Sequence, residues 1–127
     1  MSAADDMLAK KVWAVVGVSA DSSKFGYKVY RRLKKAGYTV YGINPGLAEL
    51  EGDKVYHDLA SLPERPEVAC FVVPPAVTAA QVPECARQGI TKLWLQPGSA
   101  GAETLALAGK HELTALQGCV LTELRKR

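Results

Sequence analysis

The stretch from Val12 to Gly26, Val-Trp-Ala-Val-Val-Gly-Val-Ser-Ala-Asp-Ser-Ser-Lys-Phe-Gly, decides the fold of this chain. Residues 12–18 are apolar or glycine without polar alternation, which is typical of a strand buried on both faces of a parallel sheet. A turn rich in glycine and serine follows, and apolar residues then recur at helical spacing over residues 27–36. The stretch therefore predicts the strand, turn and helix that open an α/β sheet.

The rest of the chain repeats this alternation of strand and helix. Four further strands are predicted at residues 38–43, 68–73, 92–95 and 113–116, a single helical turn at 58–62, and two helices at 78–88 and 100–108. The helix at 78–88 is predicted to start in a capping box at Thr78–Gln81, with Pro83 either kinking its first turn or forming its true first residue. Alternation with right-handed crossovers predicts a Rossmann-like, doubly wound parallel sheet of about five strands, with helices on both faces.

Composition bounds the class of protein. The 127 residues are 48% hydrophobic and 23% charged, which predicts one globular domain over residues 1–127. The net charge of +3 includes a basic cluster at residues 31–35, which we interpret as a solvated helix end because cations are favoured at helix C-termini. We therefore expect no nucleic-acid partner. No run approaches the roughly 18 apolar residues of a membrane helix, so no membrane association is expected either.

The three cysteines are an odd, widely spaced set without metal-like spacing to either histidine. This usage is typical of free thiols in a reducing compartment, and it predicts a cytoplasmic protein without a metal site. Cys70 and Cys85 are expected in the core, whereas Cys119 follows the last strand and is the thiol best placed to face a ligand. Neither His57 nor His111 lies near other residues that could form a catalytic group with it, so no catalytic residues are predicted.

The first loop does not match the standard nucleotide motifs. A dinucleotide fingerprint needs a second glycine where Ser19 stands and an acidic residue after the second strand, where Asn44 and Pro45 stand. The Walker pattern is missing as well. The loop still opens a helix, whose free N–H groups attract anions, and it carries serine hydroxyls and Lys24. A phosphate site of another shape and an ordinary polar turn both remain open.

Four turns are expected to meet at one edge, because the carboxyl ends of parallel strands lie together. They are residues 17–26, Asn44-Pro45-Gly46, Pro74-Pro75 and Gln96-Pro97-Gly98. A ligand is expected there.

These residues resemble the small single-domain CoA-binding proteins, which are similar to the N-terminal CoA-binding domain of the succinyl-CoA synthetase alpha subunit. The signature comprises Val15–Ser19, Gly26-Tyr27, Gly37–Val40, Ile43–Pro45, Gly52–Tyr56, Val72–Pro75, Leu93–Gly98 and Cys119. The resemblance extends from about Leu8 to Val120. Three features depart from the family pattern: no lysine follows the second strand, Gln117-Gly118 stands where many members have charged residues before the final cysteine, and the second domain with its phosphorylated histidine is missing.

The resemblance implies that coenzyme A, or an acyl-CoA, lies across the carboxyl edge of the sheet. The implied CoA-binding residues are Gly17, Val18, Ser19, Ala20, Ser22, Lys24, Gly26, Asn44, Pro45, Val73, Pro74, Pro75, Gln96, Pro97 and Gly98. Ligase activity is not implied, so the leading hypothesis is a non-catalytic CoA-binding or regulatory protein, monomeric or homodimeric. A minimal NAD(P)-linked oxidoreductase using the same edge is the alternative. A third hypothesis is a scaffold protein that exchanges protein partners on binding CoA. Exposure of Trp13 or Trp94 would favour this hypothesis.

Overall fold

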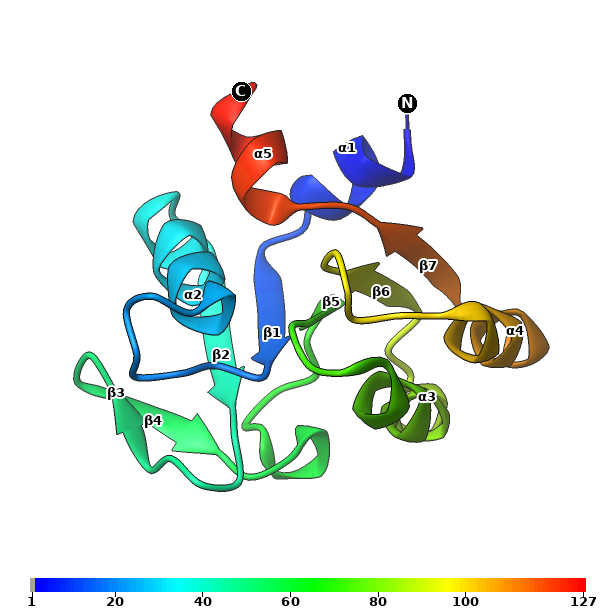
Figure 1. Ribbon diagram of the computed structural model, residues 1–127, viewed down its shortest axis with the longest axis horizontal. Helices are drawn as coiled ribbons and strands as arrows, with labels where there is room; N and C mark the ends of the chain where they lie inside the picture. The colour runs from blue at the N-terminus through cyan, green and yellow to red at the C-terminus, as the bar shows by residue number, and fades with distance from the viewer. Residues whose placement is uncertain (1) are drawn as a thin grey trace.

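The structure, a computed structural model, describes residues 2–127. It contains a single twisted sheet between two layers of helices (Figure 1). In chain order the elements are α1 (Ala3–Leu8), β1 (Val12–Val16), α2 (Phe25–Lys35), β2 (Thr39–Ile43), β3 (Glu49–Leu50), β4 (Asp53–Tyr56), the 3-10 turn η1 (Leu59–Ser61), β5 (Val68–Phe71), α3 (Pro75–Gln88), β6 (Lys92–Leu95), α4 (Ala102–Lys110), β7 (Thr114–Gln117) and α5 (Val120–Arg125).

The seven strands lie in the order β3-β4-β2-β1-β5-β6-β7. Neighbouring strands are parallel except β3, which pairs antiparallel with β4 at the edge. The predicted doubly wound α/β sheet is confirmed, but the expected number of about five strands was too low. The two extra strands are β3, which has two residues, and β4, which pairs with β2 only through Gly42↔Val55 and Ile43↔Tyr56. β3 is too short to leave a periodic signal, and β4 was visible in the sequence only as a short extended piece at Val55-Tyr56.

The central strands are apolar throughout because both faces of the sheet are covered. Trp13 and Val15 of β1 pack into one core, and Ala14 and Val16 into the other. Trp13 meets Trp94 of β6 at 5.7 Å between ring centroids, and both side chains are fully buried. Burying such a side chain stabilises the fold by about 1.5–3 kcal/mol. The tryptophans therefore serve the core, and the exposure that would favour a scaffold is not observed.

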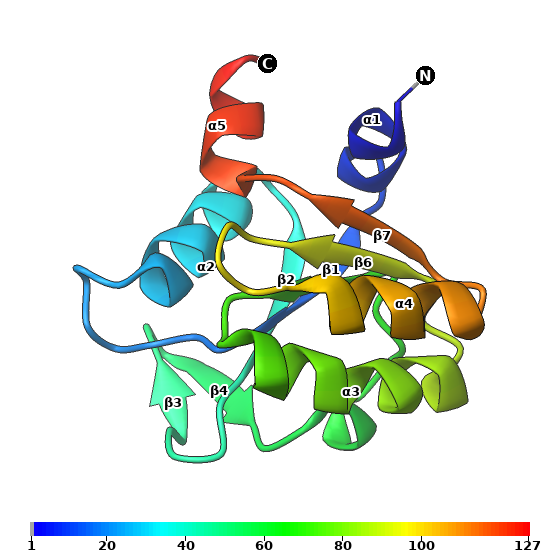
Figure 2. The ribbon, with the colours of Figure 1, turned by 45° about the vertical axis from the view of Figure 1, so that its right-hand side comes forward.

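The helices divide between the two faces, as predicted. Residues of α1, α2 and α5 share the core that contains Trp13, whereas η1, α3 and α4 cover the opposite face (Figure 2). Figure 2 shows α3 and α4 running side by side on one face of the sheet, with α2 and α5 on the other face.

Helix α3 begins earlier than predicted. Pro75 is its first residue, and the capping box expected at Thr78–Gln81 is wrong, because Thr78 lies inside the helix and its hydroxyl faces the carbonyl of Pro74 at 3.5 Å. Proline suits the first helical position, where its missing N–H would have no partner. Pro83 lies in the interior, and the helix continues through it because burial of Val82 and Cys85 on the sheet outweighs one lost hydrogen bond.

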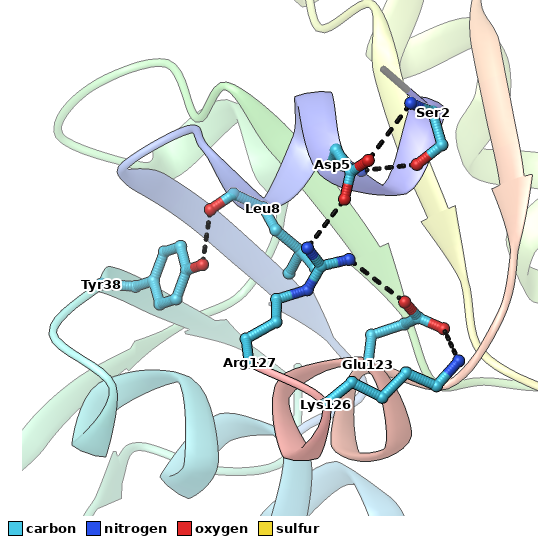
Figure 3. Close-up of polar contacts among 7 residues, drawn as sticks. All are labelled: Ser2, Asp5, Leu8, Tyr38, Glu123, Lys126 and Arg127. Atoms are coloured by element: carbon cyan, nitrogen blue, oxygen red, sulfur yellow. Dashed lines mark hydrogen bonds and ion pairs between the residues drawn. The ribbon is translucent and has the colours of Figure 1, made fainter.

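The terminal helices α1 and α5 were not predicted from the sequence, and polar contacts tie them together (Figure 3). Arg127 donates to Asp5 at 2.7 Å and to Glu123 at 3.3 Å, and the Tyr38 hydroxyl donates to the carbonyl of Leu8. These contacts join both ends of the chain to the start of β2. They lie away from the carboxyl edge of the sheet.

The basic cluster at the end of α2 is partly neutralised by the β3–β4 hairpin. Arg31 pairs with Glu51, and Lys34 pairs with Asp53. The hydroxyl of Tyr27 also donates to Glu51, at 3.1 Å. The cluster thus anchors α2 to the hairpin rather than standing wholly in solvent.

Candidate functional site

The strand order reverses at β1, which lies between β2 and β5. The chain leaves β1 toward β2 through α2, and later enters β5 on the other side of β1. Such a switch point opens a crevice beyond the carboxyl ends of the strands. Residues from all four predicted turns line two cavities at this edge, and a third, of about 300 Å³, lies beside them between residues 96–100 and 117–118.

The first-loop cavity has a volume of about 190 Å³ and lies between the ends of β1 and β2. Its lining residues are Val16, Gly17, Ile43, Asn44, Pro45, His57, Asp58, Val73, Val77 and Gln81. Asp58 caps η1 by accepting from the N–H of Ser61 at 2.9 Å, so one of its carboxylate oxygens already has a structural role.

The apolar cavity has a volume of about 430 Å³ and lies beyond β5 and β6. It is lined by Phe25, Val72, Val73, Pro74, Pro75, Gln96, Pro97, Gly98, Ser99 and Cys119, a set that contains no aspartate, glutamate, lysine or arginine. Val73 lines both cavities, so they adjoin at this side chain.

Two glycines let the first loop fit against its neighbours. Gly17 has a φ of +105°, and a Cβ there would lie 2.5 Å from the carbonyl oxygen of Val72. A Cβ on Gly26 would overlap with the carbonyl oxygen of Gly17 and approach the Cα of Val18 to 3.3 Å. The start of α2 therefore rests directly on the backbone that leaves β1, which only glycine allows.

Internal hydrogen bonds shape the tip of the first loop. The backbone N–H of Asp21 donates to the Ser19 hydroxyl at 3.0 Å. The Asp21 carboxylate in turn accepts from the Ser23 hydroxyl at 2.7 Å and from the Ser23 N–H at 2.9 Å. These bonds from Ser23 lower the pKa of Asp21. The carboxylate is thus turned into the loop.

The N-terminus of α2 points its first N–H groups toward this loop without a side-chain cap. Lys24 occupies the N-cap position, where serine, threonine or aspartate would normally accept a hydrogen bond. Lys28 lies one turn later, with its ammonium 5.7 Å from the centroid of the Phe25 ring. Uncapped N–H groups and two lysines make this end of α2 suited to an anion.

Asn44 fixes the second turn against the first loop. Its Nδ2 donates to the carbonyl of Val18 at 2.7 Å, and its Oδ1 accepts from the N–H of Gly46 at 2.8 Å. Both ends of the amide are therefore engaged within the protein. Asn44 shapes the wall of the first-loop cavity.

Gln96 links the turn after β6 to the start of α5. It is 3% exposed, its Oε1 accepts from the N–H of Val120 at 2.7 Å, and its Nε2 lies 3.6 Å from the Cys119 sulfur. Trp94 Nε1 also donates to the carbonyl of Gly118 at 2.9 Å. The segment that carries Cys119 is thus held beside the end of β6.

The structure brings together most of the predicted site residues. Nine of the fifteen line the two cavities, namely Gly17, Asn44, Pro45, Val73, Pro74, Pro75, Gln96, Pro97 and Gly98. Val18 is buried in the core, and Ser19, Ala20, Ser22, Lys24 and Gly26 belong to the first loop and the start of α2 outside the cavity walls. The sequence reasoning missed Phe25, His57, Asp58, Val77, Gln81 and Ser99, of which Phe25, Val77 and Gln81 are brought there by the docking of α2 and α3.

A separate cavity of about 440 Å³ lies at the opposite edge and is lined by residues of α1, the end of α2 and α5, including Asp5, Arg32 and Arg127. It is called the amino-edge cavity below. None of the four turns reaches it.

Within residues 2–127 the structure contains no group of three histidine, cysteine, aspartate or glutamate residues that could hold a metal ion. Over the same range, no helix has the length and apolar character needed to cross a bilayer.

Comparison with known proteins shows the family to which this chain is similar. The profile of the CoA binding domain family matches residues 11–125. An ADP-forming acetate–CoA ligase of Archaeoglobus fulgidus is 34% identical over 80 residues, which cover 63% of this chain and 12% of the ligase. This chain therefore corresponds to a small part of that enzyme.

Two solved structures share the fold over nearly the whole chain. A conserved hypothetical protein from Pyrococcus furiosus is 32% identical, with a TM-score of 0.84 and coverage of 89% of this chain and 98% of that one. A hypothetical protein from Pyrococcus horikoshii is 25% identical, with a TM-score of 0.91 and coverage of 99% and 92%. The two structures share the fold, and the match of the CoA binding domain profile to residues 11–125 confirms the resemblance to CoA-binding domains.

Proposed function

Because this chain belongs to the family of CoA binding domains, we propose that it binds coenzyme A or an acyl-CoA at the carboxyl edge of its sheet, without chemistry of its own. The observation that carries the proposal is the convergence of the four predicted turns on two adjoining cavities at the switch point. A ligand with one charged and one uncharged half would fit two such neighbouring cavities.

The anionic half of CoA belongs at the first loop. Its pyrophosphate would face the uncapped N–H groups of α2, with Lys24 and Lys28 supplying positive charge. The nucleotide would then lie in the first-loop cavity, beside Asn44 and Pro45. Because both ends of the Asn44 amide are occupied, this wall contributes shape rather than new hydrogen bonds.

The uncharged pantetheine arm belongs in the apolar cavity. The walls there are formed by Val73, Pro74 and Pro75 on one side and by residues 96–99 on the other. An apolar pocket with a few polar groups suits a chain of methylenes and amides. A free thiol or a short acyl group would lie at the far end of this arm.

Two features support binding without catalysis. Gln96, the side chain that contacts Cys119, is an amide and cannot act as a general base. Asp58, the acid beside His57, already caps η1. Neither cavity thus offers a nucleophile hydrogen-bonded to a base among residues 2–127.

Isothermal titration of protein freed of bound ligand tests the proposal. We expect CoA to bind at one site per chain, and pantetheine alone to bind more weakly because it lacks the phosphates. NADH is the discriminating ligand, since a change in its fluorescence on mixing would favour the oxidoreductase alternative. Absence of heat and of thermal stabilisation at about 1 mM CoA, equivalent to affinity weaker than about −4 kcal/mol, would refute CoA binding.

A further inference from the structure

The apolar cavity contains one thiol, and the other two cysteines lie out of reach of any ligand. Cys70 in β5 and Cys85 in α3 are both 0% exposed. Cys119 is partly exposed and lines the apolar cavity together with Val72 and Gln96. Only this sulfur can meet a molecule that occupies the cavity.

The surroundings of Cys119 favour its thiolate. Burial acts to raise its pKa, but hydrogen bonds from the backbone and hydroxyl of Thr122, from the Gln96 amide and from the backbone of Leu121 together lower it below the ordinary value. Burial instead raises the pKa of Cys70, and it raises the pKa of Cys85 to about 12. The thiolate is the reactive form of cysteine. Cys119 is therefore favoured over Cys70 and Cys85 both by its exposure and by its lower pKa.

The walls of the apolar cavity indicate which end of the ligand reaches Cys119. Apart from the Cys119 thiol they contain no acidic or basic side chain, whereas Lys24 and Lys28 lie at the start of α2. Phosphates held at α2 leave only the uncharged arm of CoA to enter the apolar cavity, and that arm ends in a thiol. This step rests on the function proposed above. Two sulfur atoms then share one pocket, one from the protein and one from the ligand.

We propose that Cys119 forms a mixed disulfide with the sulfur of bound CoA, so that the site retains CoA covalently under oxidising conditions. The oxidant is a disulfide of CoA. The Cys119 thiolate attacks one sulfur of that disulfide, the sulfur–sulfur bond of the oxidant breaks, and one CoA leaves as a thiolate that takes up a proton from water. The Cys119 sulfur is oxidised and the sulfur of the departing CoA is reduced. An incoming thiol reverses the reaction by the same exchange.

Intact-protein mass spectrometry of the reduced full chain, incubated with CoA disulfide, tests the inference. We expect a single adduct with the mass of one CoA less two hydrogens, lost on addition of dithiothreitol. Peptide mapping should place it on Cys119, with Cys70 and Cys85 unmodified as internal controls. The Cys119→Ser variant should form no adduct.

Pantethine, the matched disulfide without the nucleotide, measures the contribution of the binding site. At equal low concentrations CoA disulfide should react at least about tenfold faster, because bound phosphates raise the effective concentration of the disulfide at the thiol. In protein unfolded by urea the two reagents should react at similar rates. The rate in folded protein should also rise with pH through a midpoint below that of the unfolded chain.

The outcomes separate this inference from the proposed function. Calorimetric binding of reduced CoA without any adduct would overturn the disulfide and leave CoA binding intact. Equal rates for CoA disulfide and pantethine, or labelling spread over the three cysteines, would also overturn it, since the reaction would then owe nothing to the site. Failure of both binding and adduct formation would overturn both proposals.

Discussion

Replacing Gly26 by alanine should damage both the stability of the fold and the proposed ligand site. The added Cβ would overlap with the carbonyl oxygen of Gly17, and it would lie 3.1 Å from the Gly17 carbonyl carbon and 3.3 Å from the Cα of Val18. All three obstructing atoms are backbone, so the overlap is relieved only if α2 moves away from the end of β1. The first loop would move with it.

The magnitude follows from two opposing effects. Alanine in a helix is favoured over glycine by about 1 kcal/mol. Forcing extra volume into a packed region costs about 1–3 kcal/mol, and contact with rigid backbone belongs at the upper end. We therefore expect Gly26→Ala to lower the free energy of unfolding by about 1–2 kcal/mol. Displacement of the loop should weaken CoA binding at least about tenfold, equivalent to 1.4 kcal/mol.

Gly109→Ala in α4 is the matched control, because a Cβ there meets no atom within 4 Å. This variant should be more stable than the parent by about 0.5–1 kcal/mol through helix propensity alone. Urea-induced unfolding, followed by circular dichroism, compares the two variants, and calorimetry measures CoA binding by each. If Gly26→Ala were as stable as Gly109→Ala and bound CoA equally well, the close approach of α2 to the first loop would have no energetic importance.

Three further predictions concern other contacts. Gln96→Ala leaves the buried N–H of Val120 unpaired and should lower the free energy of unfolding by about 1–3 kcal/mol in urea denaturation; an unchanged midpoint would contradict this. Lys24→Ala should weaken CoA binding about three- to tenfold, whereas Lys110→Ala in α4 should not, and equal calorimetric affinities would exclude Lys24 from the phosphate site. Arg127 and Ser2 lower the pKa of Asp5 from 3.8 to about 2, so this carboxylate stabilises the fold above pH 3.8 and loses its effect as pH falls through 2. Asp5→Asn should remove that part of the acid dependence in thermal unfolding, and an identical pH profile would refute it.

The longer elements were predictable because burial alone explains them. The strand over residues 92–95 was predicted with its observed bounds, since its apolar run is covered on both faces. Helix α3 shows where local signals mislead. Thr78–Gln81 has the form of a capping box, but Pro75 starts the helix three residues earlier. The choice depends on how the segment leaves β5, and no local pattern records that.

The location of the candidate site at the carboxyl edge of the sheet was predictable, but the contacts of its side chains were not. Turn residues after successive parallel strands must meet, so Gly17, Asn44 and Gln96 could be grouped from sequence. The functions of their side chains could not. Asn44 binds the first loop and Gln96 holds the start of α5, because each contacts a segment distant in the chain. Phe25 is exposed beside the apolar cavity, which its place in an amphipathic helix does not indicate.

Mapping of backbone amide shifts by NMR during a titration with CoA tests most directly that CoA lies across the carboxyl edge. We predict that the shifted amides are those of the first loop, of Asn44, Gly46 and Val73, and of Gln96, Gly98 and Ser99, because the prolines between them have no N–H. A parallel titration with pantetheine should shift the amides of residues 96–99 but not those of the first loop, which should respond to CoA alone. Shifts concentrated around Asp5, Arg32 and Arg127 would place the ligand in the amino-edge cavity and contradict the account.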